Sequence, residues 1–384
     1  MSDEANPLNV LPMCYIINLY STRAQVCQQG RGNMQIAFTA DIHLTSDQIH
    51  PERENALREI LKVIADQNIQ ILIIAGDCFD RDFTNILPLE VIVKETKSDD
   101  LMIYLLPGNH DESIKQSFFS LSNIRVIETT SIEIIAGKKF LFVPYKNGRS
   151  MGEEIGRFEN ELKGESWILV GHGDLSSYSA AGTQYEPGMY MPLSKRDLNL
   201  FKPSLCLMGH IHKPLQEKNV YYAGSPCGLD ITECGRRRIA ILDINNMQVK
   251  SQIIETEVIF LNESILITPS DDEIQQVGKE IDHLFEPYYP AEISKIKLRL
   301  NLFGYSFNRS TLVKNLEVFL KEKYGLKNCE IFSDEVQPAN EDFVRQQISE
   351  KTINFINELE FGDGGEKKNQ VMKEAMKLIF GGRS

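Results

Sequence analysis

The chain has 384 residues, of which 42% are hydrophobic, 9% aromatic and 25% charged. These are ordinary globular values and exclude wholesale disorder, while a net charge of −13 argues against a general nucleic-acid coat or a polybasic membrane binder. No apolar run reaches the roughly 18–20 residues that a membrane span needs, so we expect a soluble protein of two or three domains with no membrane contact.

The N-terminal stretch and the cysteines bear on where the protein works. Residues 1–33 contain an apolar patch at Val10–Tyr20 without a preceding basic region or a cleavage site, so no signal peptide is predicted. These residues are either a genuine extension or lie before a true start near Met34. The seven cysteines are scattered and form no CxxC pair, which favours a reducing, cytoplasmic location without disulfides or a zinc–thiolate site.

From Met34 onward, apolar runs of strand length alternate with helical patterns. The amphipathic stretch Pro51–Asp66 predicts a helix that begins at a proline suited to its first turn. This alternation favours an α/β fold in which helices cover a buried sheet. The predicted strands are Gln35–Ala40, Ile69–Ala75, Met102–Leu106, Trp167–Val170, Leu205–Met208, Tyr221–Ala223 and Arg238–Ile244.

The pattern changes after about residue 255. A predicted helix at Asp272–Leu284 precedes Ser294–Phe303, whose strict alternation is typical of a half-buried strand. A second helix, capped by Ser310 and ended by Gly325, leads to a strand at Cys329–Phe332. Two further helices are expected at about 341–359 and 366–380, separated by the glycine-rich stretch 361–365.

Five short polar motifs each follow a predicted strand. They are Asp41-Ile42-His43, Gly76-Asp77-Cys78-Phe79-Asp80, Gly108-Asn109-His110-Asp111, Gly171-His172 and Gly209-His210-Ile211-His212, and they contain five of the seven histidines. Open α/β sheets place their ligand crevice at the carboxyl ends of strands, so these motifs are predicted to converge there. His50 and His283 lie outside the motifs, and each is expected to be a surface or helix-capping histidine.

The chemistry of these side chains indicates metal ions. Histidine, carboxylate and one asparagine without cysteine form a mixed nitrogen and oxygen set, which suits manganese, iron or zinc better than a thiolate zinc site. The set is large enough for two ions that share a carboxylate. Two metals about 3.5–4 Å apart can activate a water and hold both oxygens of an in-line phosphoryl displacement.

In this order, DxH, GDxxD, GNHD, GH and GHxH resemble the motifs of the calcineurin-like metallophosphoesterase superfamily. The stretches MQIAFTADIHL, GDCFD, LPGNHD, GHIHKP and YYAGSP are similar to those of the SbcD-type DNA-repair nuclease, a bacterial relative of the Mre-type nuclease subunit. The resemblance extends from Met34 to about Ile244. It implies a β-sandwich flanked by helices (αββα), followed by a small α+β cap domain and C-terminal helices.

The resemblance also implies domain limits and the roles of residues. The phosphoesterase domain would span 34–255, the DNA-binding cap 256–338 and the C-terminal, partner-binding helices 339–384. One metal would be held by Asp41, His43 and His212, the other by Asn109, His172 and His210, and Asp77 would bridge both. His110 would be the catalytic histidine beside the scissile phosphate, with Asp80 or Asp111 orienting a histidine.

The function implied is a DNA exonuclease or endonuclease that uses two divalent ions, manganese first, with iron, magnesium or zinc as alternatives. DNA would be the substrate, and an SMC-like ABC-type ATPase and a second copy of the chain would be partners. One rival is a phosphatase or small-molecule phosphodiesterase on the same metal core. Another is a regulatory subunit whose metal site is vestigial.

Two surface features leave alternatives open. The basic run Arg236-Arg237-Arg238 is either a solvated strand entry or a phosphate contact. The apolar stripe of the last helix, from Val371 to Ile379, either packs on its own core or docks in a partner's groove. The stretch Gly224–Gly228 is expected to shape a loop near the site.

Overall fold

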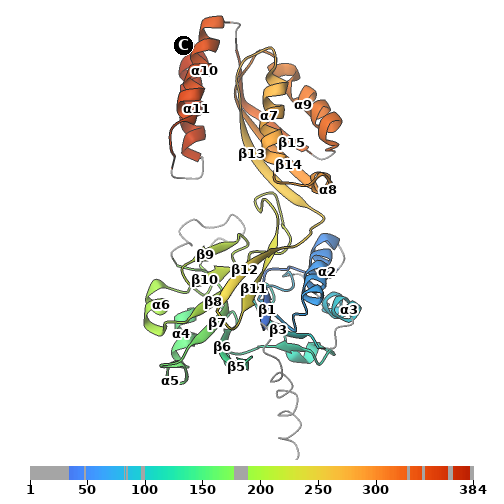
Figure 1. Ribbon diagram of the computed structural model, residues 1–384, viewed down its shortest axis with the longest axis vertical. Helices are drawn as coiled ribbons and strands as arrows, with labels where there is room; N and C mark the ends of the chain where they lie inside the picture. The colour runs from blue at the N-terminus through green and yellow to red at the C-terminus, as the bar shows by residue number, and fades with distance from the viewer. Residues whose placement is uncertain are drawn as a thin grey trace, which may run out of the picture.

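A computed structural model describes residues 34–380 apart from 47–48, 82, 84, 97–99, 177–188, 327–328, 340–341 and 362–365. Two six-stranded sheets form the lower body of the molecule, and a three-stranded sheet with its helices forms an upper lobe (Figure 1). Within these described ranges, no helix has the length and apolar character needed to cross a membrane. The predicted extension 1–33 and the glycine-rich break lie largely outside them.

The two large sheets are parallel at their centres and antiparallel at one or both edges. The first has the order β12 (Gln248–Ile253), β11 (Arg238–Asp243), β1 (Gln35–Thr39), β2 (Ile71–Ala75), β3 (Met102–Leu106) and β4 (Ile124–Val126). The second has the order β5 (Ser131–Ile135), β6 (Lys138–Val143), β7 (Trp167–His172), β8 (Leu205–Gly209), β10 (Val220–Tyr222) and β9 (Leu215–Glu217). The strands that precede the five polar motifs, β1 to β3, β7 and β8, all run parallel to their neighbours within this group.

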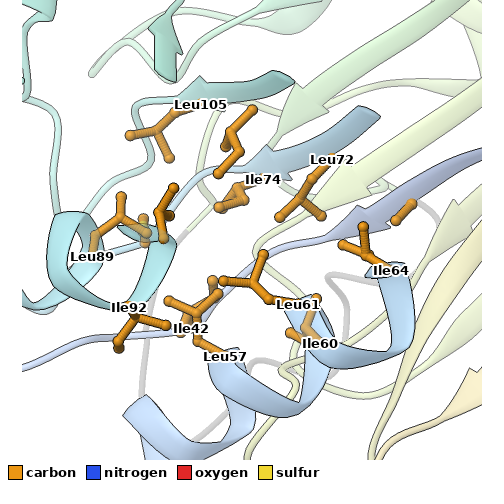
Figure 2. Close-up of a cluster of buried hydrophobic side chains, with 14 of the residues drawn as sticks. Ile42, Leu57, Ile60, Leu61, Ile64, Leu72, Ile74, Leu89, Ile92 and Leu105 are labelled. Atoms are coloured by element: carbon orange, nitrogen blue, oxygen red, sulfur yellow. The ribbon is translucent and has the colours of Figure 1, made fainter. Parts of the chain in front are cut away.

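The cores lie between the sheets and under the helices. Phe38 and Ile73 of the first sheet pack against Phe142 and Val170 of the second. The outer face of the first sheet is covered by α2 (Pro51–Asp66) and α3 (Leu87–Glu95), whose leucines and isoleucines meet those of β2 and β3 (Figure 2). The outer face of the second sheet is covered by α4 (Met151–Gly156), α5 (Glu159–Leu162) and α6 (Lys195–Phe201). The predicted αββα sandwich is therefore confirmed.

The upper lobe is a parallel sheet of β13 (Ile259–Ile267), β14 (Ile296–Ser306) and β15 (Cys329–Pro338). Helices α7 (Glu273–Phe285) and α9 (Arg309–Tyr324) cover one face, because the alternating leucines of β14 all point there, and the short α8 (Pro290–Ile293) precedes β14. Gly325 ends α9 in the left-handed conformation, as predicted. The predicted cap is wrong: Asn308, not Ser310, precedes the helix, and its side chain makes no capping bond.

The C-terminal helices α10 (Phe343–Asn357) and α11 (Glu366–Phe380) pack against each other, and α11 packs against β14. Met372 and Met376 of the predicted apolar stripe are buried with Phe303 and Tyr305 of β14 and Ile356 of α10. These two side chains of the stripe therefore pack on the chain's own core, whereas Val371 at its start is 42% exposed.

Candidate metal centre

The predicted ligands gather at the carboxyl ends of five strands drawn from both large sheets. Asp41 and His43 follow β1, Asp77 follows β2, and Asn109 and His110 follow β3. From the second sheet, His172 ends β7, and His210 and His212 follow β8. Three overlapping groups connect this cluster, each with ligand atoms within 4.8 Å of one another: Asp41, His43, His212; His43, Asp77, His110; and Asp77, His172, His210.

The first half of the cluster matches the first predicted metal set, Asp41, His43 and His212. The Nε2 atoms of His43 and His212 face each other at 3.2 Å. The Nδ1 atom of His212 donates to the Glu233 carboxylate, so its Nε2 atom carries a free lone pair in the neutral ring. The Nδ1 atom of His43 is buried and has no hydrogen-bond partner among the described residues.

The second half brings together Asn109, His172 and His210, the second predicted set. The Asn109 Oδ1 atom lies 2.8 Å from His172 Nε2 and 3.1 Å from His210 Nδ1. Asp77 stands between the halves, with its Oδ2 atom 3.3 Å from His172 Nε2 and 3.9 Å from His43 Nε2. This is the position that a bridging carboxylate requires.

The surroundings of His172 demand a positive charge. Its Nδ1 atom lies 2.8 Å from the Ala75 carbonyl oxygen, which can only accept, so Nδ1 donates and the neutral ring has no proton on Nε2. Yet Nε2 faces two oxygens, those of Asn109 and Asp77. Burial lowers the pKa of His172, but the Asp77 carboxylate outweighs it and raises this pKa to about 10. A cation among these atoms satisfies all of them, which is how the donor set fits a divalent metal.

The pKa values of the two buried carboxylates, Asp77 and Asp41, are shifted in opposite directions. Burial by itself raises the pKa of Asp77, but the His172, His43 and His110 rings hold it well below its usual range. Asp41 is fully buried, and this burial raises its pKa against the opposing effect of His212 and His172. Its oxygens accept the His210 backbone N–H at 3.0 and 3.1 Å, which joins the loop after β1 to the loop after β8.

His110, the predicted catalytic histidine, is held by a short chain of polar contacts. Its Nδ1 atom lies 3.0 Å from Asp80 Oδ1, and the other oxygen of Asp80 accepts from Arg53 at 3.0 Å. Arg53 is buried at the start of α2 and also donates to the His43 carbonyl at 2.8 Å. Burial opposes the ionised form of Asp80, but the His110 and His43 rings hold its pKa well below the usual range.

Asp111 plays a different part from Asp80. Its two oxygens accept the backbone N–H groups of Gly108 at 2.6 Å and Phe79 at 3.1 Å, whereas Asp80 contacts the His110 ring. Asp111 therefore ties the loop after β3 to the loop after β2. Burial, helped by the nearby Asp77 charge, raises its pKa to about 7.

The backbone is strained where the ligands sit. Asp41, His43, Asp77 and His210 all have positive φ values, of 56°, 52°, 48° and 98°. This conformation costs a non-glycine residue about 1–3 kcal/mol and persists where surrounding structure imposes it. Here the imposing contacts are the hydrogen bonds between loops, such as Asp41 N–H to the Gly76 carbonyl and His43 N–H to the Asp77 carbonyl, both 3.0 Å.

Sequence reasoning missed three charged residues at the centre. Arg53 could have been found, because helical spacing places it on the buried face of α2 with Ala56, Leu57 and Ile60. Glu233 binds His212, and Asp174 lies 3.6 Å from His210 Nε2. Both lie in irregular segments, where no periodic pattern marks a residue as buried.

The remaining predicted features lie outside the set of predicted ligands. His50 and His283 are at the surface, each beside a glutamate. Neither alternative for the basic run describes Arg237, which is buried and donates to the carbonyl oxygens of Ser225 and His212. Arg236 instead forms an ion pair with Glu292 of α8.

The match to a known protein family agrees with the site. Residues 34–214 match the calcineurin-like phosphoesterase family. Among solved structures, the protein TT1561 of Thermus thermophilus aligns at 12% identity over 58% of this chain and 99% of its own, with a TM-score of 0.37. A novel archaeal phosphodiesterase aligns at 16% identity over 57% and 99%, with a TM-score of 0.32. No curated protein sequence matches this chain.

Proposed function

We propose, from the match of residues 34–214 to the calcineurin-like phosphoesterase family, that the chain is a two-metal-dependent DNA nuclease. The observation that carries the proposal is the shared position of Asp77 between two half-sites, with His110 beside them. Two metals, for which manganese is our choice, would be held by Asp41, His43 and His212 and by Asn109, His172 and His210. When bound, they supply a Lewis acid for the phosphate and an activated water.

The chain's own residues would then orient the phosphodiester and donate a proton or stabilise the developing charge. Asp80 contacts the Nδ1 atom of His110 at 3.0 Å, so the ring would present its Nε2 atom to a substrate oxygen. Arg53 donates to Asp80 and to the His43 carbonyl, and it thereby holds in place the carboxylate that contacts the His110 ring. His110 would stabilise charge on the phosphate or protonate the leaving oxygen.

The choice of DNA over a small phosphoester rests on the sequence resemblance and on the upper lobe. The sheet face opposite α7 and α9 carries Lys297 over the Phe260 ring at 5.4 Å and Arg299 over Phe332 at 5.5 Å. Phe332 is 47% exposed. Cations over aromatic rings, of which Phe332 is exposed and Phe260 partly buried, suit the backbone and bases of a nucleic acid. The bulk negative charge of the chain leaves tight DNA binding to a partner.

The test is manganese-dependent cleavage of end-labelled duplex and single-stranded DNA, with bound metal measured in the same preparations. We expect His110→Ala to keep its metals and to cleave about 10²–10⁴-fold more slowly, the range for loss of a general acid or base. Asp77→Ala should lose metal as well as cleavage. His283→Ala, an exposed histidine beside Glu286, is the matched control and should behave as wild type.

Each outcome of this test has a clear meaning. If the wild-type protein binds two metals, leaves DNA intact and hydrolyses a chromogenic phosphoester, the nuclease proposal is wrong. The phosphatase or small-molecule phosphodiesterase is then supported instead. A protein that binds no metal after purification and reconstitution would favour the regulatory rival instead.

We also propose that the chain works as a homodimer with an SMC-like ATPase, and that α10 contributes to the ATPase contact. Val344, Ile348 and Phe355 lie on one side of this helix by their spacing and are 64%, 47% and 63% exposed. Such a stripe suits docking of a partner helix. Replacing Ile348 and Phe355 by aspartate should abolish co-purification with the ATPase while the melting temperature stays unchanged; retained co-purification would reject this surface.

A further inference from the structure

Behind His212 lies a buried polar cluster built from the segment between β10 and β11. Its centre is Glu233, whose side chain is 9% exposed, and whose Oε1 atom accepts from His212 Nδ1 at 2.7 Å. Its Oε2 atom accepts the Ser225 hydroxyl at 2.6 Å and the Leu229 backbone N–H at 3.2 Å. The two oxygens therefore have separate tasks, one toward the ligand ring and one toward the segment.

Arg237, the residue immediately before β11, completes the cluster. It is 3% exposed, donates to the His212 carbonyl at 2.7 Å and lies 3.3 Å from Glu233 Oε2. The guanidinium thus holds the backbone of His212 while Glu233 holds its ring. Burying an ionised pair is costly unless its hydrogen bonds are satisfied, and here both partners are bonded on several sides.

From this geometry we infer that Glu233 is a positioning residue for His212, and through it for the half of the metal centre formed with Asp41 and His43. A donor bond at Nδ1 fixes the tautomer of a ligating histidine and aims its Nε2 atom. The other half has no need of Glu233, because the Ala75 carbonyl performs that task for His172. The inference rests on the proposed metal centre and adds that its two halves depend on different supports.

The measurement is titration of manganese into metal-free protein by calorimetry, which reports each site without any assay of activity. For wild type we expect two ions. In Glu233→Ala one of the two should bind about 10–100-fold more weakly, the usual loss when such a hydrogen-bonding partner is removed, and the other should be unchanged. Glu233→Gln, which keeps the size of the side chain, should fall between and serves if the alanine variant folds poorly.

A double-mutant cycle separates positioning from general packing. If Glu233 acts through His212, then Glu233→Ala should weaken manganese binding in wild type and have no further effect in His212→Ala. The matched control is Glu90→Ala: Glu90 of α3 is also a buried glutamate that accepts from a serine, Ser120, and from the backbone N–H of Leu121. Its loss should lower thermal stability and leave both manganese affinities unchanged.

The results also distinguish this inference from the proposed function. Two ions in wild type, with unchanged affinities in Glu233→Ala and Glu233→Gln, would overturn the inference and leave the metal centre standing. An equal loss at both sites, or a full effect in the His212→Ala background, would assign Glu233 to packing and overturn it too. Wild-type protein that binds no pair of ions would overturn the inference together with the proposed function.

Discussion

The two halves of the metal centre are supported in different ways. His172 is fully buried at the end of β7, and its ring is fixed by a backbone carbonyl, that of Ala75 at the end of β2. His212 is 23% exposed in the loop after β8, and its ring is fixed by the side chain of Glu233. One ligand is therefore oriented by sheet backbone, whereas the other is oriented by a side chain of the segment that connects β10 to β11.

Because the two supports differ, mutations on the two sides should affect different properties of the protein. A support made of sheet backbone cannot be removed without disturbing the fold, so damage there should appear first as lost stability. A support made of one side chain can be removed alone, so damage there should appear first as lost metal affinity. This contrast can be tested by measuring the stability of glycine variants, the pH dependence of stability and the coupling energy of an ion pair to the upper lobe.

The largest effect is expected at Gly209, the last residue of β8. A Cβ atom there would overlap the Ala75 carbonyl oxygen, the same atom that fixes His172. Gly209→Ala should lower the free energy of unfolding by about 3 kcal/mol or more, the upper range for overpacking a core. Thermal and urea unfolding of the metal-free protein measure it.

Gly235, in the segment on the His212 side, is the matched control. It has a φ of 86°, and the nearest atom to an added Cβ is the Tyr288 hydroxyl at 4.0 Å. Gly235→Ala should therefore lower the free energy of unfolding by about 1–2 kcal/mol, which is the cost of holding a non-glycine residue in the left-handed conformation. Equal losses of stability in the two variants would contradict the contrast between a support made of sheet and one made of a segment.

A second effect concerns the pH dependence of stability. It arises at Asp111, whose hydrogen bonds join the loops after β2 and β3. Burial and the Asp77 charge raise its pKa from the ordinary 3.8 to about 7 in the folded protein. Between these pH values the folded state keeps a proton that the unfolded state has released, so this group's contribution makes stability fall as pH rises from about 4 to about 7. The slope for one proton is about 1.4 kcal/mol per pH unit.

Unfolding of the metal-free protein across this pH range, with and without Asp111→Asn, measures that contribution. The variant should lack this part of the slope, although it also loses one of the two bonds to Gly108 and Phe79 N–H, since an amide has only one acceptor oxygen. Parallel curves for the two proteins would show that Asp111 has an ordinary pKa and that the tie does not depend on its protonation.

The smallest effect is expected at the link between the His212 side and the upper lobe. Arg236 bonds Glu292 through two nitrogens, at 2.8 and 2.6 Å, and lies over the Tyr288 ring at 4.9 Å. A double-mutant cycle of Arg236→Ala and Glu292→Gln in urea unfolding should give a coupling of about 1 kcal/mol or less, as for other partly exposed pairs. The more exposed Lys323–Asp282 pair is the control and should couple more weakly. A coupling energy no larger than that of the control would mean that this ion pair does not stabilise the segment between β10 and β11.

Much of the sandwich could be predicted because its signals are local. Pro51–Asp66 appears as α2 with the predicted limits, and the strand-length runs before the polar motifs are β1, β2, β3, β7 and β8. Other strands carry no such signal. β12 is an edge strand in which Gln248, Lys250 and Ser251 are exposed without strict alternation, and β13 interrupts its apolar residues with Asn262, Glu263 and Ser264.

The five motifs and their positions after strands could be predicted from the amino-acid sequence, because glycines, histidines and carboxylates at strand ends are typical of a ligand crevice in an α/β fold. The orientation of each ligand depends instead on contacts between distant segments. Glu233 lies 21 residues from His212 in the chain, and Ala75 lies 97 residues from His172. Such contacts depend on how two sheets and a connecting segment pack, and hydrophobic periodicity, which reports only which face of an element is buried, does not encode them.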